Sequence, residues 1–191
     1  MKISELFLKY QSDKNEGSLY PSDHLRGHTY GKSYDKIFEK FDRKSNFNIL
    51  EIGIQKGGSM LAWKDYFENS NIYGVDIVDC ILPEYRREDF NYIFDDIKSN
   101  NVTKILSNLT FDIIIDDGSH FLSDVLFTVS NYLSKLNDGG VLIIEDCQHP
   151  EGWIEEIGKL VDDNYRIITA DLRYDRGQPQ YDNFLIIIEK Q

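Results

Sequence analysis

Residues 48–59 read NILEIGIQKGGS, and this stretch decides the fold class. The apolar run from Phe47 ends at Gly53, which predicts a buried β-strand. The glycines that follow let the backbone turn tightly and approach a ligand closely. After the turn, residues 59–67 carry apolar side chains at a helical spacing. A strand, a glycine-rich turn and a helix in this order are typical of an α/β protein that binds its ligand at the turn.

Strand-like and helix-like segments alternate through the rest of the chain. We expect further strands at 71–76, 90–94, 111–116, 141–144, 165–170 and 184–188, and helices at 3–10, 33–42, 59–67, 102–109, 122–136 and 153–161. Strands that are apolar on both faces predict a mostly parallel sheet with helices on both faces. The last two strands leave no room for a helix between them. We therefore predict an α/β fold whose seven-stranded sheet ends in a C-terminal antiparallel hairpin.

Length and charge restrict the class of protein. The chain has 191 residues, which fits a single domain, with 21 Lys+Arg against 33 Asp+Glu and a formal net charge of −12. A surface this acidic argues against a nucleic acid or an anionic membrane as the main partner, because the phosphate field would repel it. The negative charge does not argue against a cationic ligand or a metal ion as a binding partner.

The cysteines and the N-terminus predict an intracellular protein. Two cysteines, Cys80 and Cys147, cannot form a disulfide framework and suggest a reducing compartment. No apolar segment typical of a signal peptide follows Met1. The longest apolar runs are about five residues, whereas a membrane span needs ~20. We expect a cytoplasmic protein.

Acidic residues end the predicted strands and point to a nucleoside cofactor. Asp76 ends the strand NIYGVD, where an acid hydrogen-bonds a ribose diol. NAD and S-adenosylmethionine both offer that diol. The loop after Gly53 is neither G-x-G-x-x-G nor a P-loop, and acidic Glu51 precedes it, which suits a cofactor with a sulfonium charge and no phosphate. Asp95 or Asp96 would then meet the adenine edge, with capping of the next helix as the alternative.

Two further strand ends carry paired acids, in FDIIIDDGSH (111–120) and GGVLIIEDCQH (139–149). If these strands are neighbours, about 4.8 Å apart, their ends lie side by side. Four carboxylates would then converge, namely those of Asp116, Asp117, Glu145 and Asp146. Carboxylates this close together repel one another unless they are protonated or bind a cation. Carboxylate oxygens are suitable ligands for Mg²⁺ or Mn²⁺. The alternative is that some of them cap helices or face solvent.

Histidines near these acids are candidate bases. His120 follows Asp117 in the loop that leaves its strand, where it could take a proton from an acceptor hydroxyl. His149, in the loop after the neighbouring strand, is the rival base. His24 and His28 belong to the N-terminal segment and would line an acceptor pocket, with a surface location as the alternative.

The residues quoted so far resemble a known family. NILEIGIQKGGSMLAWKDYF (48–67), IYGVDI (72–77), FDIIIDDGSH and GGVLIIEDC (139–147) are similar to class I S-adenosylmethionine-dependent methyltransferases, with a Rossmann-like fold. More narrowly, they resemble the metal-dependent sugar O-methyltransferases of macrolide and glycan biosynthesis. SDKNEGS and HTYGKSYDKIF (28–38) in the N-terminal part resemble the same group. There such an arm closes over the cofactor, so we expect residues 1–45 to cover the site and 46–191 to form the core.

The resemblance implies the residues of the cofactor site. Glu51, Gly53 and Ser59 would surround the methionine part of S-adenosylmethionine. Asp76 would bind the ribose, and the Asp95/Asp96 region would meet the adenine. The full set implied for the cofactor also includes two residues beside these strand ends, Ile77 and Asp116.

The resemblance also implies the metal site and the base. Asp117, Glu145 and Asp146 would hold Mg²⁺ or Mn²⁺, and His120 would be the general base, with Asp117 counted as catalytic too. The expected activity is methylation of a hydroxyl on a sugar, in a glycan, a nucleotide-sugar or a glycosylated natural product.

Two other functions stay open at this point. One is a catechol-type methyltransferase of small phenols, which shares the metal chemistry; tyrosines and histidines of the N-terminal part favour a sugar over an apolar phenol. The other is a non-catalytic module that binds cofactor or sugar. The larger macrolide enzymes carry an extra N-terminal domain, which we do not expect here. This expected difference leaves the acceptor and the oligomeric form open, a homo-oligomer included.

Overall fold

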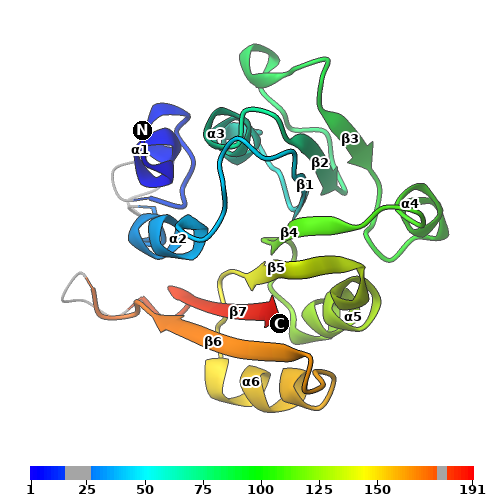
Figure 1. The fold of residues 1–191 in the computed structure, drawn as a ribbon. Coiled ribbons are helices and arrows are strands. Elements are labelled where there is room, and N and C mark those ends of the chain that lie inside the picture. Colours follow the sequence, from blue (N-terminus) through cyan, green and yellow to red (C-terminus); the bar gives the residue numbers. More distant parts are fainter. Residues whose placement is uncertain (16–26, 176–179) are drawn as a thin grey trace.

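Seven strands form one sheet in the order β3-β2-β1-β4-β5-β7-β6 (Figure 1). The structure is a computed structural model that describes residues 1–15, 27–175 and 180–191. The strands are β1 (Asn48–Ile52), β2 (Asn71–Asp76), β3 (Asn91–Phe94), β4 (Phe111–Asp116), β5 (Leu136–Ile144), β6 (Tyr165–Asp171) and β7 (Phe184–Lys190). Every predicted strand is therefore present.

The pairing of the strands confirms the predicted topology. The pairs β1–β2, β2–β3, β1–β4 and β4–β5 are parallel. Strand β7 runs antiparallel to both of its neighbours, β5 and β6. The order along the sheet reverses between β1 and β4, and ligands of open α/β sheets bind beyond the strand ends at such a reversal. This is the Rossmann-like fold of methyltransferases, with a C-terminal antiparallel hairpin.

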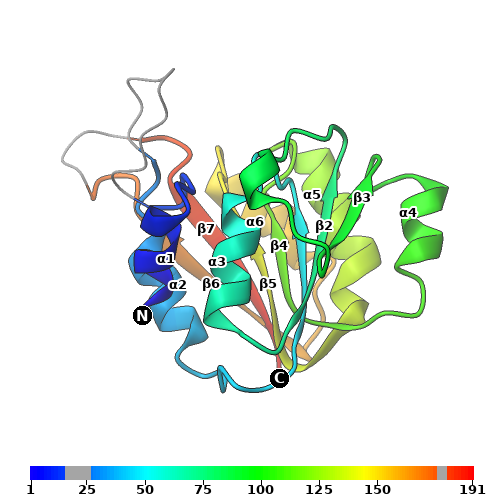
Figure 2. The same cartoon turned by 90° about the horizontal axis from the view of Figure 1, so that it is seen from above.

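Helices cover both faces of the sheet (Figure 2). One apolar cluster joins the sheet to α1 (Ile3–Lys9), α2 (Gly31–Phe38) and α3 (Gly58–Tyr66), and the other joins it to α4 (Asn100–Ile105), α5 (Leu122–Tyr132) and α6 (Pro150–Gly158). Two short 3-10 turns are η1 (Pro83–Tyr85) and η2 (Leu133–Lys135). Among the helices of the described ranges, none combines the length and the apolar character needed to cross a membrane.

Aromatic packing fixes the N-terminal helices against the core. Trp63 of α3 is fully buried and contacts the rings of Phe7, Tyr34 and Phe38, with centroids 5.0, 5.3 and 5.8 Å away. Such pairs contribute about 0.5–1.5 kcal/mol each beyond the area that they bury. Helices α1 and α2 are therefore packed parts of the fold. They bring the N-terminal segment to the carboxyl ends of the central strands.

Several predicted helix boundaries differ by a few residues from those of α2, α4 and α6, and the largest difference lies between α5 and β5. We expected a single helix over 122–136 that stops at Gly139-Gly140, with a strand only at 141–144. Helix α5 instead ends at Tyr132, and β5 already begins at Leu136. A register shift against β4, between Phe111 and Ile113, lets the strand accommodate the two glycines. Leu133 and Leu136 are buried, so they continue the apolar pattern of the helix without belonging to it.

The two cysteines should differ in reactivity. Cys80 is exposed and Cys147 is fully buried, and burial raises the pKa of the Cys147 thiol well above its ordinary value. Since the thiolate is the reactive form, we expect iodoacetamide to label Cys80 alone in the native protein. Peptide mass mapping checks this, with urea-denatured protein as the control in which both react. Native labelling of Cys147 would contradict the described packing.

Candidate active site

A cavity of about 640 Å³ opens where the strand order reverses. Ligand sites usually measure about 300–1,000 Å³, so this one is large enough for a nucleoside cofactor. Of the residues predicted to bind the cofactor, all but Glu51 line it, namely Gly53, Ser59, Asp76, Ile77, Asp95, Asp96 and Asp116. The fold thus gathers them around one space, and their binding roles stay predictions.

The loop after β1 is held by the end of β2. The backbone N–H groups of Ile54 and Gln55 donate to Asp76 Oδ2, at 3.0 and 2.9 Å. Gly53 has φ +84, and a Cβ atom there would lie 1.9 Å from the carbonyl oxygen of Asp117. The turn therefore requires glycine, because the loop passes directly against the backbone that follows β4. Asp76 organises this loop, whether or not it also binds a ribose.

Gly53→Ala should damage both the fold and the cofactor site. The added methyl group meets the Asp117 carbonyl, and alanine is strained at a φ of +84. We expect the free energy of unfolding in urea to fall by more than about 2 kcal/mol, and S-adenosylmethionine binding measured by calorimetry to be lost.

The matched control for that variant is Gly152→Ala in α6, where a Cβ atom meets nothing within 4 Å. It should leave stability unchanged or raise it by up to about 1 kcal/mol, because alanine favours a helix over glycine. Equal behaviour of the two variants would contradict the tight turn at Gly53.

Glu51 is fully buried and is not among the residues that line the cavity. Its Oε2 accepts hydrogen bonds from Ser59 Oγ at 2.8 Å and Trp63 Nε1 at 2.9 Å. Burial raises the pKa of the Glu51 carboxyl above its ordinary value. The residue ties β1 to the start of α3, and its predicted contact with the cofactor stays a prediction.

The acids after β3 shape a turn. Asp95 Oδ2 accepts from Ser99 Oγ at 2.9 Å, and Asp96 Oδ1 accepts from the Lys98 backbone N–H at 2.8 Å. The alternative that one of them caps α4 is wrong, because the N-cap is Ser99, which accepts from Val102 N. Both aspartates line the cavity, where an adenine edge would meet them.

Strands β4 and β5 are neighbours, as the acid-cluster hypothesis required. Asp116 pairs with Ile52 of β1 and Ile144 of β5, and the Glu145 backbone N–H donates to Asp116 O at 3.0 Å. The ends of β4 and β5 therefore lie side by side. Burial raises the pKa of the Asp116 carboxyl, against the opposing effect of hydrogen bonds from Thr128 and from the Gly118 backbone N–H.

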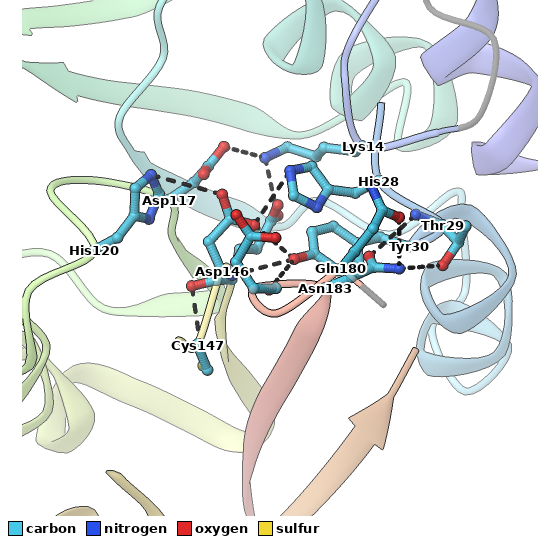
Figure 3. Close-up of polar contacts among 12 residues, drawn as sticks. Lys14, His28, Thr29, Tyr30, Asp117, His120, Asp146, Cys147, Gln180 and Asn183 are labelled. Carbon is cyan, nitrogen blue, oxygen red and sulfur yellow. Dashed lines mark hydrogen bonds and ion pairs between the residues drawn. The ribbon is translucent and has the colours of Figure 1, made fainter. Parts of the chain in front are cut away.

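Three side chains at this edge could hold a metal ion. One ligand atom each from Asp117, His120 and Asp146 lies within 4.8 Å of the others (Figure 3). All three residues line the 640 Å³ cavity. Burial is the main cause that raises the pKa of the Asp146 carboxyl, and the nearby His28 opposes this shift. Carboxylate and imidazole groups that converge in this way fit a divalent cation.

The backbone is strained at two of these residues. His120 has φ +56 and Asp146 has φ +55, in the left-handed region that side chains other than glycine rarely adopt. Each such residue costs of the order of 1–3 kcal/mol, and strain of this kind clusters at functional sites. The strain aims both side chains at the same point: His120 Nε2 lies 3.7 Å from Asp146 Oδ2.

Glu145 faces the N-terminal segment. Its side chain is almost fully buried, and its Oε1 accepts a hydrogen bond from Tyr34 OH and lies 2.9 Å from Lys14 Nζ. Burial raises the pKa of Glu145 well above its ordinary value, against the opposing effect of Lys14. Its role as a metal ligand stays a prediction, since it is not among the three groups that converge within 4.8 Å.

Sequence reasoning assigned no role to Lys14 and Tyr30. The hydroxyl group of Tyr30 donates to Asp146 Oδ1 at 2.6 Å, and Lys14 Nζ lies 2.5 Å from Asp117 Oδ2. Burial lowers the pKa of Lys14, but Asp117, Glu145 and Glu51 together raise it well above the ordinary value. The only available signal was their place in the two N-terminal motifs.

The histidines separate into two groups. His28 stacks on Tyr30, and its Nε2 lies 3.5 Å from Asp146 Oδ1, so it reaches the acid cluster. His149 is exposed and is the N-cap of α6, where it lines a shallower depression of about 460 Å³. His120 lines both hollows, which favours it over His149 as the base. His24 lies outside the described residues.

These features define the class of the protein. A seven-stranded sheet with this strand order, an antiparallel β7 and a nucleoside-sized cavity at the reversal is the class I methyltransferase fold. No family model matches the chain. Among solved structures, the MycE methyltransferase of the mycinamycin pathway, in complex with Mg and SAH, superimposes with a TM-score of 0.71 at 24% identity. That superposition covers all of this chain and 55% of the MycE chain.

Sequence comparison gives the particular relatives. The chain is 33% identical over 136 residues to 8-demethyl-8-alpha-L-rhamnosyl tetracenomycin-C 2'-O-methyltransferase of Streptomyces olivaceus, which covers 66% of this chain and 35% of that protein. It is 32% identical over 152 residues to demethylmacrocin O-methyltransferase of Streptomyces fradiae, covering 75% and 36%. The chain is therefore placed among the S-adenosylmethionine-dependent methyltransferases, as a relative of the sugar O-methyltransferases of macrolide and polyketide glycoside biosynthesis. The matched regions make up about a third of those two relatives.

Proposed function

We propose that residues 1–191 act as one methyltransferase domain that transfers a methyl group from S-adenosylmethionine to a hydroxyl group of a sugar, with the help of Mg²⁺ or Mn²⁺. The acceptor would be a glycan, a nucleotide-sugar or a glycosylated natural product. The observation that carries the proposal is that Asp117, His120 and Asp146 converge and open into the same cavity as the residues predicted to bind the cofactor.

The donor atoms of the cluster suit a hard dication. Asp117 and Asp146 supply carboxylate oxygens from the ends of neighbouring strands, and Glu145 is a third predicted ligand beside them. A bound dication would supply Lewis acidity that lowers the pKa of the acceptor hydroxyl group. The MycE structure that superimposes on this chain was solved with Mg, which supports the choice of ion.

His120 is proposed to take the proton of the acceptor hydroxyl group and is therefore not counted among the proposed metal ligands Asp117, Glu145 and Asp146. Its Nε2 faces Asp146 Oδ2 at 3.7 Å, so a proton that arrives on the ring is stabilised by a carboxylate. Tyr30 OH holds the other oxygen of Asp146 at 2.6 Å and so fixes the orientation of that carboxylate. Geometry of this kind favours the reaction mainly by positioning the reacting atoms.

The acceptor is proposed to enter beside His120. The depression next to the cavity is lined by Phe121, Trp153 and His149, with His120 shared between the two hollows. An apolar ring next to hydrogen-bonding groups suits a sugar, which has an apolar face and polar edges. The name of the Streptomyces olivaceus relative, which contains a rhamnosyl group, supports the same class.

Mass spectrometry after incubation with S-adenosylmethionine and Mg²⁺ tests the proposal. Panels of nucleotide-sugars, oligosaccharides, glycosylated polyketides and catechols would be offered in parallel. We expect one added methyl group on a sugar. Methylation of catechols alone would indicate that the acceptor is a small phenol and not a sugar. Cofactor binding without any methylated product would favour a binding module.

A further inference from the structure

Lys14 is a buried cation inside the acid cluster, and the proposed reaction does not use it. Its side chain is 2% exposed, and its Nζ lies 2.5 Å from Asp117 Oδ2, 2.9 Å from Glu145 Oε1 and 3.4 Å from Glu51 Oε1. These carboxylates follow or belong to three neighbouring strands, β4, β5 and β1. One ammonium group from the N-terminal segment therefore joins three strand ends of the sheet. Figure 3 shows Lys14 beside Asp117.

The segment that carries Lys14 is held in place by its backbone. The Ser12 N–H donates to Phe7 O at 2.9 Å, and the His28 N–H donates to Asp13 O at 2.5 Å. A Cβ atom on Gly58, at the start of α3, would lie 2.4 Å from Tyr10 O, so the segment passes directly against this helix. The ammonium group is therefore a fixed charge of the site rather than the end of a side chain that moves freely in solvent.

The ammonium group divides the cluster into two sides. On the inner side, Lys14 and Tyr34 both contact Oε1 of Glu145. On the outer side, Asp146 is surrounded by Tyr30, His28 and His120. Asp117 is shared, because it contacts Lys14 and also converges with His120 and Asp146.

We propose that Lys14 is a positioning residue that acts as an internal cation: it neutralises the inner side of the acid cluster and directs a dication to the outer side. By holding one oxygen each of Asp117 and Glu145, it leaves the other oxygen of these carboxylates for a ligand. It also weakens binding of the dication, because like charges that share the half-buried carboxylate of Asp117 repel each other. The inference rests on the cation site of the proposed function.

Binding of Mn²⁺ by the whole chain, followed by electron paramagnetic resonance of the free ion, tests this role. Lys14→Met removes the internal charge, and we expect it to bind Mn²⁺ at least about tenfold more tightly than the wild type. Lys14→Arg keeps the charge and should stay close to the wild type. Lys40→Met removes a lysine that pairs with Glu189 outside both hollows, and should leave the affinity unchanged.

The outcomes separate this inference from the proposed function. If the wild type binds Mn²⁺ and Lys14→Met binds it equally or more weakly, Lys14 is only a structural tether and the inference is wrong. If the wild type binds no Mn²⁺, the cation site of the proposed function fails as well. If Lys14→Met does not fold alone, recovery of its circular dichroism spectrum by Mn²⁺ supports the internal cation, and failure at every Mn²⁺ concentration overturns it.

Discussion

Replacing His120 with asparagine is expected to lower the rate of methyl transfer by at least about 100-fold, while S-adenosylmethionine binding, measured by calorimetry, changes little. General-base catalysis contributes about 10²–10⁴-fold, and an asparagine cannot take up the proton. Asparagine is preferred to alanine as the replacement because residue 120 has φ +56, a conformation that asparagine tolerates. A loss of activity then reports the missing imidazole rather than a distorted loop.

The control is His149→Asn, since His149 is exposed and lines only the shallower depression. This variant should retain turnover within a few fold, with any change appearing in KM for the acceptor. Normal turnover in His120→Asn together with loss of activity in His149→Asn would exchange the two roles. Normal turnover in both variants would show that neither histidine is the general base.

Removal of divalent metal is the second prediction with a large effect. EDTA should lower turnover by at least about 100-fold, and Mg²⁺ or Mn²⁺ should restore it, because the dication is proposed to activate the acceptor hydroxyl group. Asp146→Asn should reproduce the loss and should weaken Mn²⁺ binding by about tenfold or more, since one carboxylate charge leaves the cluster. Asparagine also tolerates the φ of +55 at this position.

Asp138→Asn is the matched control for this variant. Asp138 is highly exposed on β5 and lies 3.3 Å from Lys190, so its replacement removes the same charge outside the cluster. Metal binding and turnover should be unchanged in this variant. Full activity of the wild type in EDTA would instead point to a methyl transfer that needs no metal.

The order of the helices and strands could be predicted from the sequence, because burial determines the apolar spacing in both kinds of element. Strands such as β4 are apolar on both faces and are covered by helices on both sides, so their pattern is unambiguous. The boundary between α5 and β5 was missed because Leu133 and Leu136 stay on the apolar face although the chain has left the helix. Apolar spacing reports which side chains are buried, but it does not report where hydrogen bonding changes.

In the candidate site, some residues could be placed from the sequence and others could not. Asp116 and Asp117 could be placed near Asp146, because neighbouring parallel strands bring their ends together. Lys14 could not be placed, since it reaches the cluster from the N-terminal segment through tertiary packing that no local pattern encodes. The contact between Glu145 and Tyr34 depends on the same packing. Residues at strand ends are thus predictable, and their partners from distant segments are not.

The proposed reaction requires the acid cluster to bind a dication next to the methyl group of the cofactor. The most direct measurement is the ¹³C NMR signal of S-adenosylmethionine labelled at its methyl carbon and bound to the protein without acceptor. We expect a sharp signal with Mg²⁺ and a strongly broadened one with equimolar Mn²⁺. In Asp146→Asn, the signal should keep its width when Mn²⁺ is added. A methyl signal of the bound cofactor that Mn²⁺ does not broaden in the wild type would contradict the proposed reaction.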